Sequence, residues 1–299
     1  MSSTDTAARV QDQPVDSASV EAGLDALETV HAQRTPASVI LRQKVLPPVL
    51  GIVLVLALWQ LAYSLELTTP DKLPSPADVW HSLTDLWYAG TLFSIIWTSV
   101  WRGLSGFALA VVIGTPIGLL VSQVKPVRAA VGPVLSGLQA LPSVAWVPAG
   151  VIWLGINNSA MYAVILLGAV PSIANGLIAG VDQVPPLFLR AGKTLGATGL
   201  RGARHILLPA ALPGYLAGLK QGWAFSWRSL MAAELIAASP DLGVGLGRYL
   251  ENQREFSDMS GVLLGIILIL FVGVAIDLLV FSPIERRVLR SRGLLVTSR

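Results

Sequence analysis

Long apolar runs, separated by short polar segments, cover most of the chain from residue 45 onward. A membrane-spanning helix needs about 20 mostly apolar residues, because each residue advances the helix by about 1.5 Å through a hydrocarbon core about 30 Å thick. Six runs are long enough, so the sequence predicts an all-α polytopic membrane protein with six transmembrane helices. They occupy residues 45–65, 93–121, 130–154, 159–181, 209–237 and 260–282.

Prolines interrupt the middle of this pattern. The predicted third span contains Pro142 and Pro148, and a proline inside a helix removes a backbone hydrogen bond and kinks or breaks the helix. Only residues 155–158 separate the third span from the fourth, which predicts a tight helical hairpin.

A shorter amphipathic helix is predicted before the second span. Ser75 is a helix cap, Pro76 suits the first helical position, and Asp78 follows the cap by three residues. Apolar and aromatic side chains then share one face, at Val79, Trp80, Leu83, Leu86 and Trp87. We expect residues 76–89 to lie on the outer membrane interface, anchored by their tryptophans.

A basic, glycine-rich segment interrupts the apolar pattern between the fourth and fifth spans. Leu187, Ala191 and Leu195 recur at every fourth residue, which predicts an amphipathic helix of about three turns. Prolines at 185 and 186 mark its start and Gly196 its end. Residues 200–207 predict a second short helix that docks back under the membrane, and Pro209 opens the fifth span.

The composition supports the membrane assignment and excludes several kinds of chemistry. The chain is 53% hydrophobic and 13% charged, whereas soluble proteins carry about 25% charged residues. The absence of cysteine excludes disulfides and thiolate catalysis. His31, His81 and His205 lie too far apart in sequence to suggest a metal site. We therefore expect no catalytic site, no metal or cofactor in this chain, and no nucleic-acid partner.

Basic residues orient the predicted helices, because lysine and arginine are enriched on the cytoplasmic side. Fifteen of them fall on the side of the two chain ends, three on the opposite side and three within spans. Both termini, and the segment 183–208, are thus predicted to be cytoplasmic. The fifteen are Arg9, Arg34, Arg42, Lys44, Lys125, Arg128, Arg190, Lys193, Arg201, Arg204, Arg286, Arg287, Arg290, Arg292 and Arg299.

The two ends are predicted to be tails that flank the membrane domain over 41–285. Residues 1–40 are polar and acidic with few aromatic residues, which favours a disordered cytoplasmic tail. They do not start with a basic group followed at once by an apolar core, so they do not predict a signal peptide. Residues 286–299 form a basic cytoplasmic tail.

Neither of two suggestive glycine motifs predicts a nucleotide site. Gly192, Lys193 and Thr194 resemble the end of a phosphate-binding loop, but the required glycine five residues earlier is Leu187. The glycines within 243–247 have the wrong spacing and predict a flexible outer loop that leads into a short helix. If the protein uses ATP, another polypeptide must bind it.

A motif in the interrupting segment resembles a known family. Gly196-x9-Ile206-x-Leu208-Pro209 is the core of the cytoplasmic motif of the permease subunits of binding-protein-dependent ABC importers. Further matching stretches resemble the branch that imports nitrate, aliphatic sulfonates, taurine and bicarbonate. They are Pro148, residues 153–155, 180–182, 194–197, 208–213, 218–219 and 232–234.

The resemblance covers about residues 45–285 and implies a type I ABC importer permease fold in a bacterial plasma (inner) membrane. It implies that 183–208 is a coupling helix that contacts a separate ATPase. The residues that match the motif are Arg190, Ala191, Gly192, Leu195, Gly196, Ile206, Leu208 and Pro209. The family motif commonly opens with Glu-Ala-Ala, whereas here Arg190 replaces the acid, so an acidic contact to the ATPase does not carry over.

The resemblance also implies partners. These are two ATPase subunits that carry ATP and magnesium, a second copy of the permease, and an extracytoplasmic solute-binding protein. The implied cargo is a small oxyanion, with an aliphatic sulfonate or taurine favoured. Nitrate, bicarbonate or a pyrimidine precursor are alternatives within the family. A secondary carrier driven by an ion gradient is the alternative from another class.

Polar residues within the spans are the candidates for the transport pathway, because an ionisable group in a span costs at least about 2.5–3.5 kcal/mol unless it faces the bundle interior or a cavity. Arg228 could hold an oxyanion through its planar guanidinium, or form an ion pair with Glu234 or Asp277. Asn175 and Gln139 either line the pathway or satisfy carbonyls that nearby prolines leave free. Arg102 and Lys220 lie nearer span ends, where they can snorkel.

Overall fold

The computed structural model describes residues 46–69, 71–236 and 242–292, and the predicted acidic tail over 1–40 lies outside these ranges. Regular structure in the described ranges is entirely helical, which confirms the all-α prediction. The chain divides into two units, residues 1–61 and 62–299. The described part of the first unit belongs to α3 (Leu46–Ser64), a 19-residue apolar helix that matches the predicted first span.

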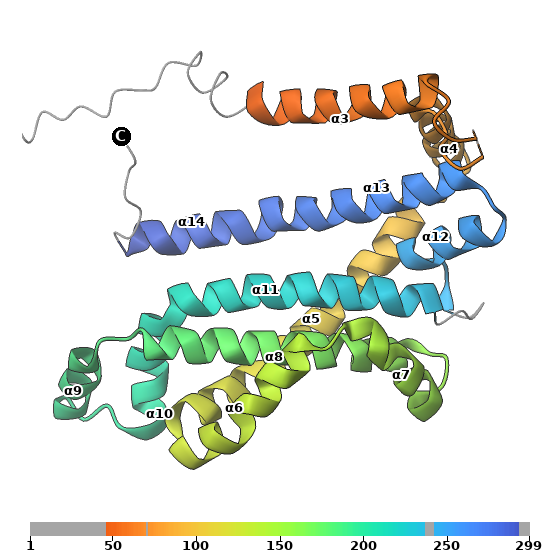
Figure 1. Cartoon of the computed structure of the whole chain (residues 1–299). Helices are drawn as coiled ribbons and strands as arrows, with labels where there is room; N and C mark the ends of the chain where they lie inside the picture. Colours follow the sequence, from red (N-terminus) through yellow and green to blue (C-terminus); the bar gives the residue numbers. More distant parts are fainter. Residues whose placement is uncertain (1–45, 70, 237–241, 293–299) are drawn as a thin grey trace, which may run out of the picture. The chain divides into compact units, whose positions relative to one another are not determined.

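The second unit is a bundle of long helices with short helices at its two ends (Figure 1). Its elements are α4 (Pro76–Tyr88), α5 (Leu92–Gln123), α6 (Lys125–Ala140), η2 (Ser143–Trp146), α7 (Val147–Leu154), α8 (Asn158–Asp182), α9 (Pro186–Thr194), α10 (Gly199–Gly202), η3 (Ala203–Leu207), α11 (Leu208–Ile236), α12 (Leu246–Glu255), α13 (Met259–Ile276), η5 (Asp277–Phe281) and α14 (Ser282–Ser291).

Four described helices are long and apolar enough to cross a membrane: α3, α5, α8 and the continuous run Met259–Ser291. The pair formed by α6 and η2–α7 would make a fifth span. The predicted fifth span is present as α11, with 29 residues. It carries Lys220, Arg228 and Glu234, and it is not among the helices that meet the same criterion of length and hydropathy.

Two predicted segments differ in detail from the structure. The segment 130–154 is not one straight helix, because α6 begins at Lys125 and the chain bends by 100° before η2–α7. Leu141, which precedes Pro142, adopts an extended backbone with ψ 134°, as a residue before proline prefers. Pro148 causes no break, since it lies in the first turn of α7. At the other end, helix α14 continues to Ser291, so the predicted tail over 286–299 begins as helix.

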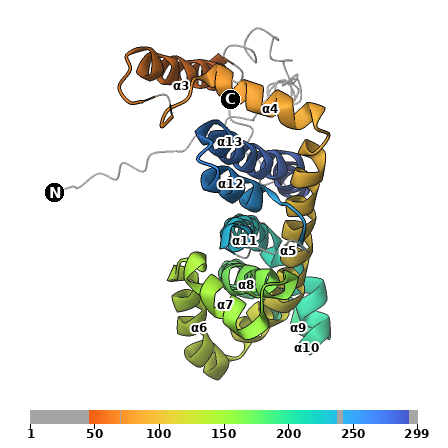
Figure 2. The same cartoon turned by 90° about the vertical axis from the view of Figure 1, so that its right-hand side faces the viewer.

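Helices α8 and α11 approach each other closely enough for their backbones to touch. A Cβ atom added to Gly176 would lie 2.2 Å from the Cα of Gly218, and one added to Gly180 would lie 2.7 Å from the carbonyl oxygen of Ala211. Small residues let membrane helices pack at this distance and gain van der Waals contact. In the end-on view, α8, α11 and α13 lie in a row and α5 runs along one side of them (Figure 2).

The helix predicted at 76–89 is confirmed as α4 (Pro76–Tyr88). The Asp78 carboxylate accepts hydrogen bonds from the Ser75 backbone nitrogen at 2.8 Å and from its hydroxyl at 2.7 Å, while the Asp78 amide donates to the Ser75 hydroxyl at 3.2 Å. These bonds from Ser75 lower the pKa of the Asp78 carboxyl. The capping box therefore stabilises α4 above the usual pKa of aspartate, and this contribution is lost as the pH falls through the lowered pKa.

We predict that Gly176→Ala destabilises the bundle by about 1–3 kcal/mol, the usual cost of overpacking, because its Cβ has no room against the backbone of α11. Gly137→Ala in α6 is the matched control, since nothing lies within 4 Å of the added Cβ. It should be neutral or stabilising by up to about 1 kcal/mol. Thermal unfolding of the two purified variants in detergent tests this, and equal melting temperatures would contradict it.

Candidate functional site

The segment 183–208 begins with the predicted amphipathic helix. α9 starts at Pro186, directly after Pro185, and ends at Thr194. Gly196 has φ +79°, a conformation that suits glycine and commonly ends a helix. The predicted start and end of this helix are thus confirmed. The predicted second helix over 200–207 is present as the four-residue α10, which continues directly into the π-helical turn η3.

Gly192 and Ile206, two residues of the motif, lie against each other. A Cβ atom on Gly192 would lie 2.0 Å from the Cδ1 of Ile206, so a larger residue here would require the Ile206 side chain to move. The carbonyl of Gly192 also accepts a hydrogen bond from the Ala197 amide at 2.9 Å. The motif glycine and isoleucine therefore hold the two halves of the segment together within this chain.

The other side of α9 is exposed and apolar. Leu187 is 70% exposed and Leu195 is 86% exposed, and Phe188 lies half exposed between them. Arg190 and Ala191 are exposed on the same short helix, while Leu208 and Pro209 form the first turn of α11. Exposed apolar side chains gathered on one short segment are typical of a protein interaction surface.

A small core anchors this segment to the long helices. Val184, Leu207 and Ala211 are buried together, with Leu119 and Val181 packed against them. Since Val184 follows α8 and Ala211 lies in the first turn of α11, the segment is fixed at both of its ends. α9 and α10 lie at the same end of the second unit as the end of α14 (Figure 1). The described residues at this end include the exposed pair of Arg128 and Asp182, joined at 2.8 and 2.6 Å.

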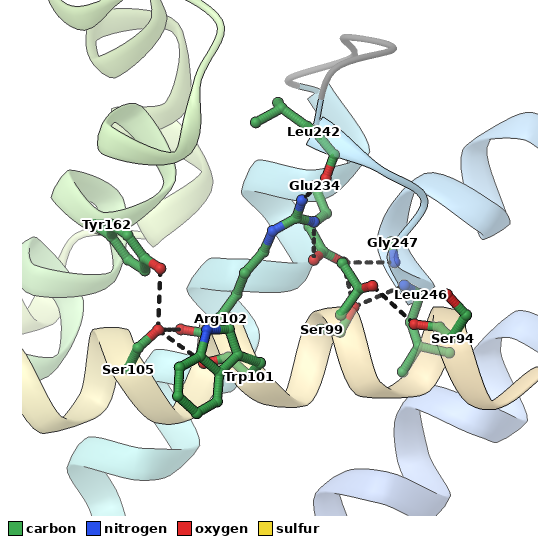
Figure 3. A network of polar contacts seen from close by, with 11 residues as sticks. Ser94, Ser99, Trp101, Arg102, Ser105, Tyr162, Glu234, Leu242, Leu246 and Gly247 are labelled. Atoms are coloured by element: carbon green, nitrogen blue, oxygen red, sulfur yellow. Dashed lines mark hydrogen bonds and ion pairs between the residues drawn. The ribbon is translucent and has the colours of Figure 1, made fainter.

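A buried ionic network occupies the opposite end of the unit (Figure 3). The Glu234 side chain, 1% exposed, accepts a hydrogen bond from Arg102 at 3.0 Å and one from the Ser99 hydroxyl at 2.7 Å. The amide of Gly247 donates to the same carboxylate at 3.1 Å, and the amide of Leu246 donates to Ser99 at 2.8 Å. Arg102 also donates to the carbonyl of Leu242. The network joins α5, α11 and the first turn of α12.

The glycines before and within α12 make this approach possible. A Cβ on Gly245 would lie 2.4 Å from a carboxylate oxygen of Glu234, and one on Gly247 would lie 2.7 Å from the Glu234 Cβ. The predicted loop and the short helix after it are present, since residues 243–245 have no regular structure and α12 begins at Leu246. The close contact places the N-terminus of α12 on the Glu234 carboxylate. The free amides and the helix dipole of such an N-terminus stabilise negative charge.

The pairing of charges differs from the sequence predictions. Arg102 does not snorkel to a membrane surface but is 6% exposed and paired with Glu234. Lys220 lies 3.2 Å from Asp277 and 3.9 Å from Glu285. The ion pair of Arg228 with Glu234 or Asp277 is not formed. Sequence periodicity did not reveal these pairs, because the partners lie on helices far apart in the chain; opposite charges within spans were the available signal.

Arg228 has an exposed side chain, and among the described residues no carboxylate forms an ion pair with it. Its Nε donates to the carbonyl of Ala224 at 3.0 Å, and its guanidinium lies 4.6 Å from the centre of the Phe225 ring. Asn175 and Gln139, the other two candidates, are joined by a hydrogen bond of 2.9 Å between α8 and α6. In the part of the chain that the structure describes, no group of three potential metal ligands occurs.

The family that matches this chain and the named relatives are all components of transport systems. Residues 106–289 match the family described as "Binding-protein-dependent transport system inner membrane component". The taurine transport system permease protein TauC of Escherichia coli (strain K12) is 30% identical over 84% of this chain and 92% of that protein. The putative aliphatic sulfonates transport permease protein SsuC of Bacillus subtilis (strain 168) is 28% identical over 80% of this chain and 85% of that protein.

A relative with a different named cargo is equally similar. The bicarbonate transport system permease protein CmpB of Synechocystis is 30% identical over 79% of this chain and 86% of that protein. Among solved structures, inward-facing conformations of the MetNI methionine ABC transporter match with a TM-score of 0.53 and 21% identity. That match covers 66% of this chain and 95% of the other, and it shows the fold.

We predict that Glu234→Gln destabilises the protein by about 3–5 kcal/mol, because it leaves Arg102 as a buried charge without its partner. Ser99→Ala should cost less, about 1–3 kcal/mol, through the loss of two hydrogen bonds. Asp182→Asn is the control: it breaks an exposed pair, which solvent screens, so it should cost least. Thermal unfolding in detergent should rank the variants in this order, and a similar loss for Glu234→Gln and Asp182→Asn would contradict the role of the network.

Proposed function

Because the chain belongs to the family of binding-protein-dependent transport system inner membrane components, we propose that it is the permease subunit of an ATP-driven importer for a small oxyanion. It is a multi-pass membrane protein and a transport subunit, not an enzyme. In the proposed complex it forms the pathway for the cargo, and a separate subunit hydrolyses ATP. Within the family, an aliphatic sulfonate or taurine is the favoured cargo.

The segment 183–208 is the proposed coupling segment. The observation that supports this role most directly is the exposed apolar face of α9, carried on a scaffold that is fixed between α8 and α11. Such a surface suits a cleft in the ATPase subunit, and a push on it is transmitted to both long helices. Arg190, Ala191 and Leu195 would meet the ATPase, whereas Gly192 and Ile206 hold the segment in shape. Gly196, Leu208 and Pro209 set where its helices begin and end.

The proposed topology places both termini and the coupling segment in the cytoplasm of a bacterium. The bias of fifteen basic residues against three supports it. Two copies of the permease, each holding one ATPase subunit, would enclose the pathway, and an extracytoplasmic solute-binding protein would deliver cargo to the outer mouth. ATP and magnesium would bind the ATPase subunits.

An oxyanion cargo is supported by the named cargoes of the relatives and by Arg228, whose guanidinium has no carboxylate partner among the described residues. We propose that Arg228 lies on the pathway together with Asn175 and Gln139, and that Glu234 shapes the wall at the outer end. Nitrate, bicarbonate or a pyrimidine precursor are the alternative cargoes within the family. The alternative mechanism is a secondary carrier driven by an ion gradient.

The two mechanisms differ in their need for ATP. We expect the chain, purified with the products of its genomic neighbours, to bring down an ATPase subunit, and we expect uptake of the cargo in proteoliposomes to be blocked by vanadate. Absence of a co-purifying ATPase, together with uptake that vanadate does not inhibit, would favour the secondary carrier and sink the proposal.

A charge on the coupling segment should uncouple the complex. We predict that Leu195→Glu lowers cargo-stimulated ATP hydrolysis at least tenfold, since it places a carboxylate in an apolar contact, while the melting temperature of the permease stays unchanged because Leu195 is exposed. Leu67→Glu, at an exposed leucine outside the segment, is the matched control. Retained stimulation in Leu195→Glu would show that the segment 183–208 does not couple through this surface.

A further inference from the structure

A cleft of about 420 Å³ lies between α11 and the α13–η5 run, which run side by side (Figures 1 and 2). Its volume is within the range of about 300–1,000 Å³ that is usual for small-molecule sites. Its walls are mostly apolar, with polar groups restricted to a few positions. Its lining includes Lys220, Trp223, Trp227 and Arg228 of α11, and residues within 269–278 on the facing helix.

The floor of the cleft is built from two buried indoles. Trp223 and Trp227 stack with ring centres 5.9 Å apart. The indole nitrogen of Trp227 donates to the carbonyl of Ile269 at 3.2 Å, which bridges the two helices. Gly273 allows this approach, since a Cβ there would lie 3.1 Å from that nitrogen. The floor is therefore a preformed apolar surface.

The two cationic side chains in the cleft differ in whether a described carboxylate pairs with them. Lys220 is paired with Asp277 at 3.2 Å, with Glu285 beyond it, so its charge is already balanced. Arg228 lies eight residues further along α11, about 12 Å away at 1.5 Å per residue, and no described carboxylate pairs with it. Its Nε donates to the carbonyl of Ala224, which leaves the two terminal nitrogens of the guanidinium as the donors that can receive one negative charge.

We propose that this cleft is a cargo site for an organic monoanion with an aliphatic chain. The anionic head binds the guanidinium of Arg228, and the chain lies on the tryptophan floor between Leu270, Val274 and Leu278, toward the neutral Lys220–Asp277 pair. Nitrate or bicarbonate would use Arg228 alone and leave the apolar walls in contact with water. The inference rests on the proposed function and narrows it, because it favours alkanesulfonates over taurine, nitrate and bicarbonate.

The site predicts a dependence of affinity on chain length. The probe is a series of unbranched sulfonates from ethanesulfonate to hexanesulfonate, with nitrate and taurine for comparison. Binding is measured by saturation-transfer NMR on the complete transporter in phosphatidylcholine nanodiscs. The solute-binding protein is left out, so that any preference among the anions comes from the membrane-bound complex. Each added methylene should tighten binding about twofold to fourfold, and nitrate and taurine should bind more weakly than hexanesulfonate.

Matched variants test separately the residue that binds the anionic head and the apolar wall that contacts the aliphatic chain. Arg228→Gln should weaken all sulfonates at least tenfold. Leu278→Asn should reduce the gain per methylene to less than twofold. Leu279→Asn is its control, because Leu279 is an exposed leucine next in sequence and does not line the cleft; it should keep the full dependence on chain length.

Three outcomes would overturn the inference. Equal affinity for ethanesulfonate and hexanesulfonate, or equal effects of Leu278→Asn and Leu279→Asn, would show that the cleft does not hold the chain. If phosphatidylglycerol, added to the nanodiscs in the proportion at which it occurs in a bacterial membrane, displaced hexanesulfonate, Arg228 would be assigned to a lipid headgroup. Each is distinct from failure of the proposed function, which would appear as loss of vanadate-sensitive uptake for every anion.

Discussion

The contact between the backbones of α8 and α11 is the constraint on which the rest of the geometry depends. Gly176 meets Gly218 and Gly180 meets Gly214, so no side chains separate the two backbones at these positions. Because of this close packing, the two helices act as one body. The segment 183–208 connects their ends on one side of the bundle. The Glu234 network fixes the far end of α11 to α5 and α12. These contacts connect the segment 183–208 to the whole length of the pair.

Charged side chains of the bundle occur in three kinds of environment, and each environment indicates a different role. The pair of Arg102 and Glu234 is buried and supplied with further donors, so it is too costly to separate during a transport cycle and joins its helices firmly. Arg128 and Asp182 form an exposed pair that contributes little to stability. Arg228 has no carboxylate partner among the described residues and lines an apolar cleft, which is the observation behind the proposed anion site.

The sequence was sufficient for features that depend on neighbouring residues. Helix α9 begins and ends where Pro186 and Gly196 predict, and the cap of α4 follows from Ser75 and Asp78. Features that depend on which helix faces which were not predictable. Arg102 and Glu234 are 132 residues apart, and helical periodicity gives the face of each residue but not its neighbour. The 100° bend after α6 also exceeds what Pro142 alone indicates, since proline marks a break but not its angle.

Different residues of the segment 183–208 determine its shape and form its exposed surface. Gly192 and Ile206 determine the shape of the segment through a contact inside the chain, whereas Leu187, Arg190 and Leu195 point away from it. A substitution at one of these exposed positions can therefore change the surface of the segment without changing the contact that sets its shape. The shape of the segment and the chemistry of its surface depend on different residues.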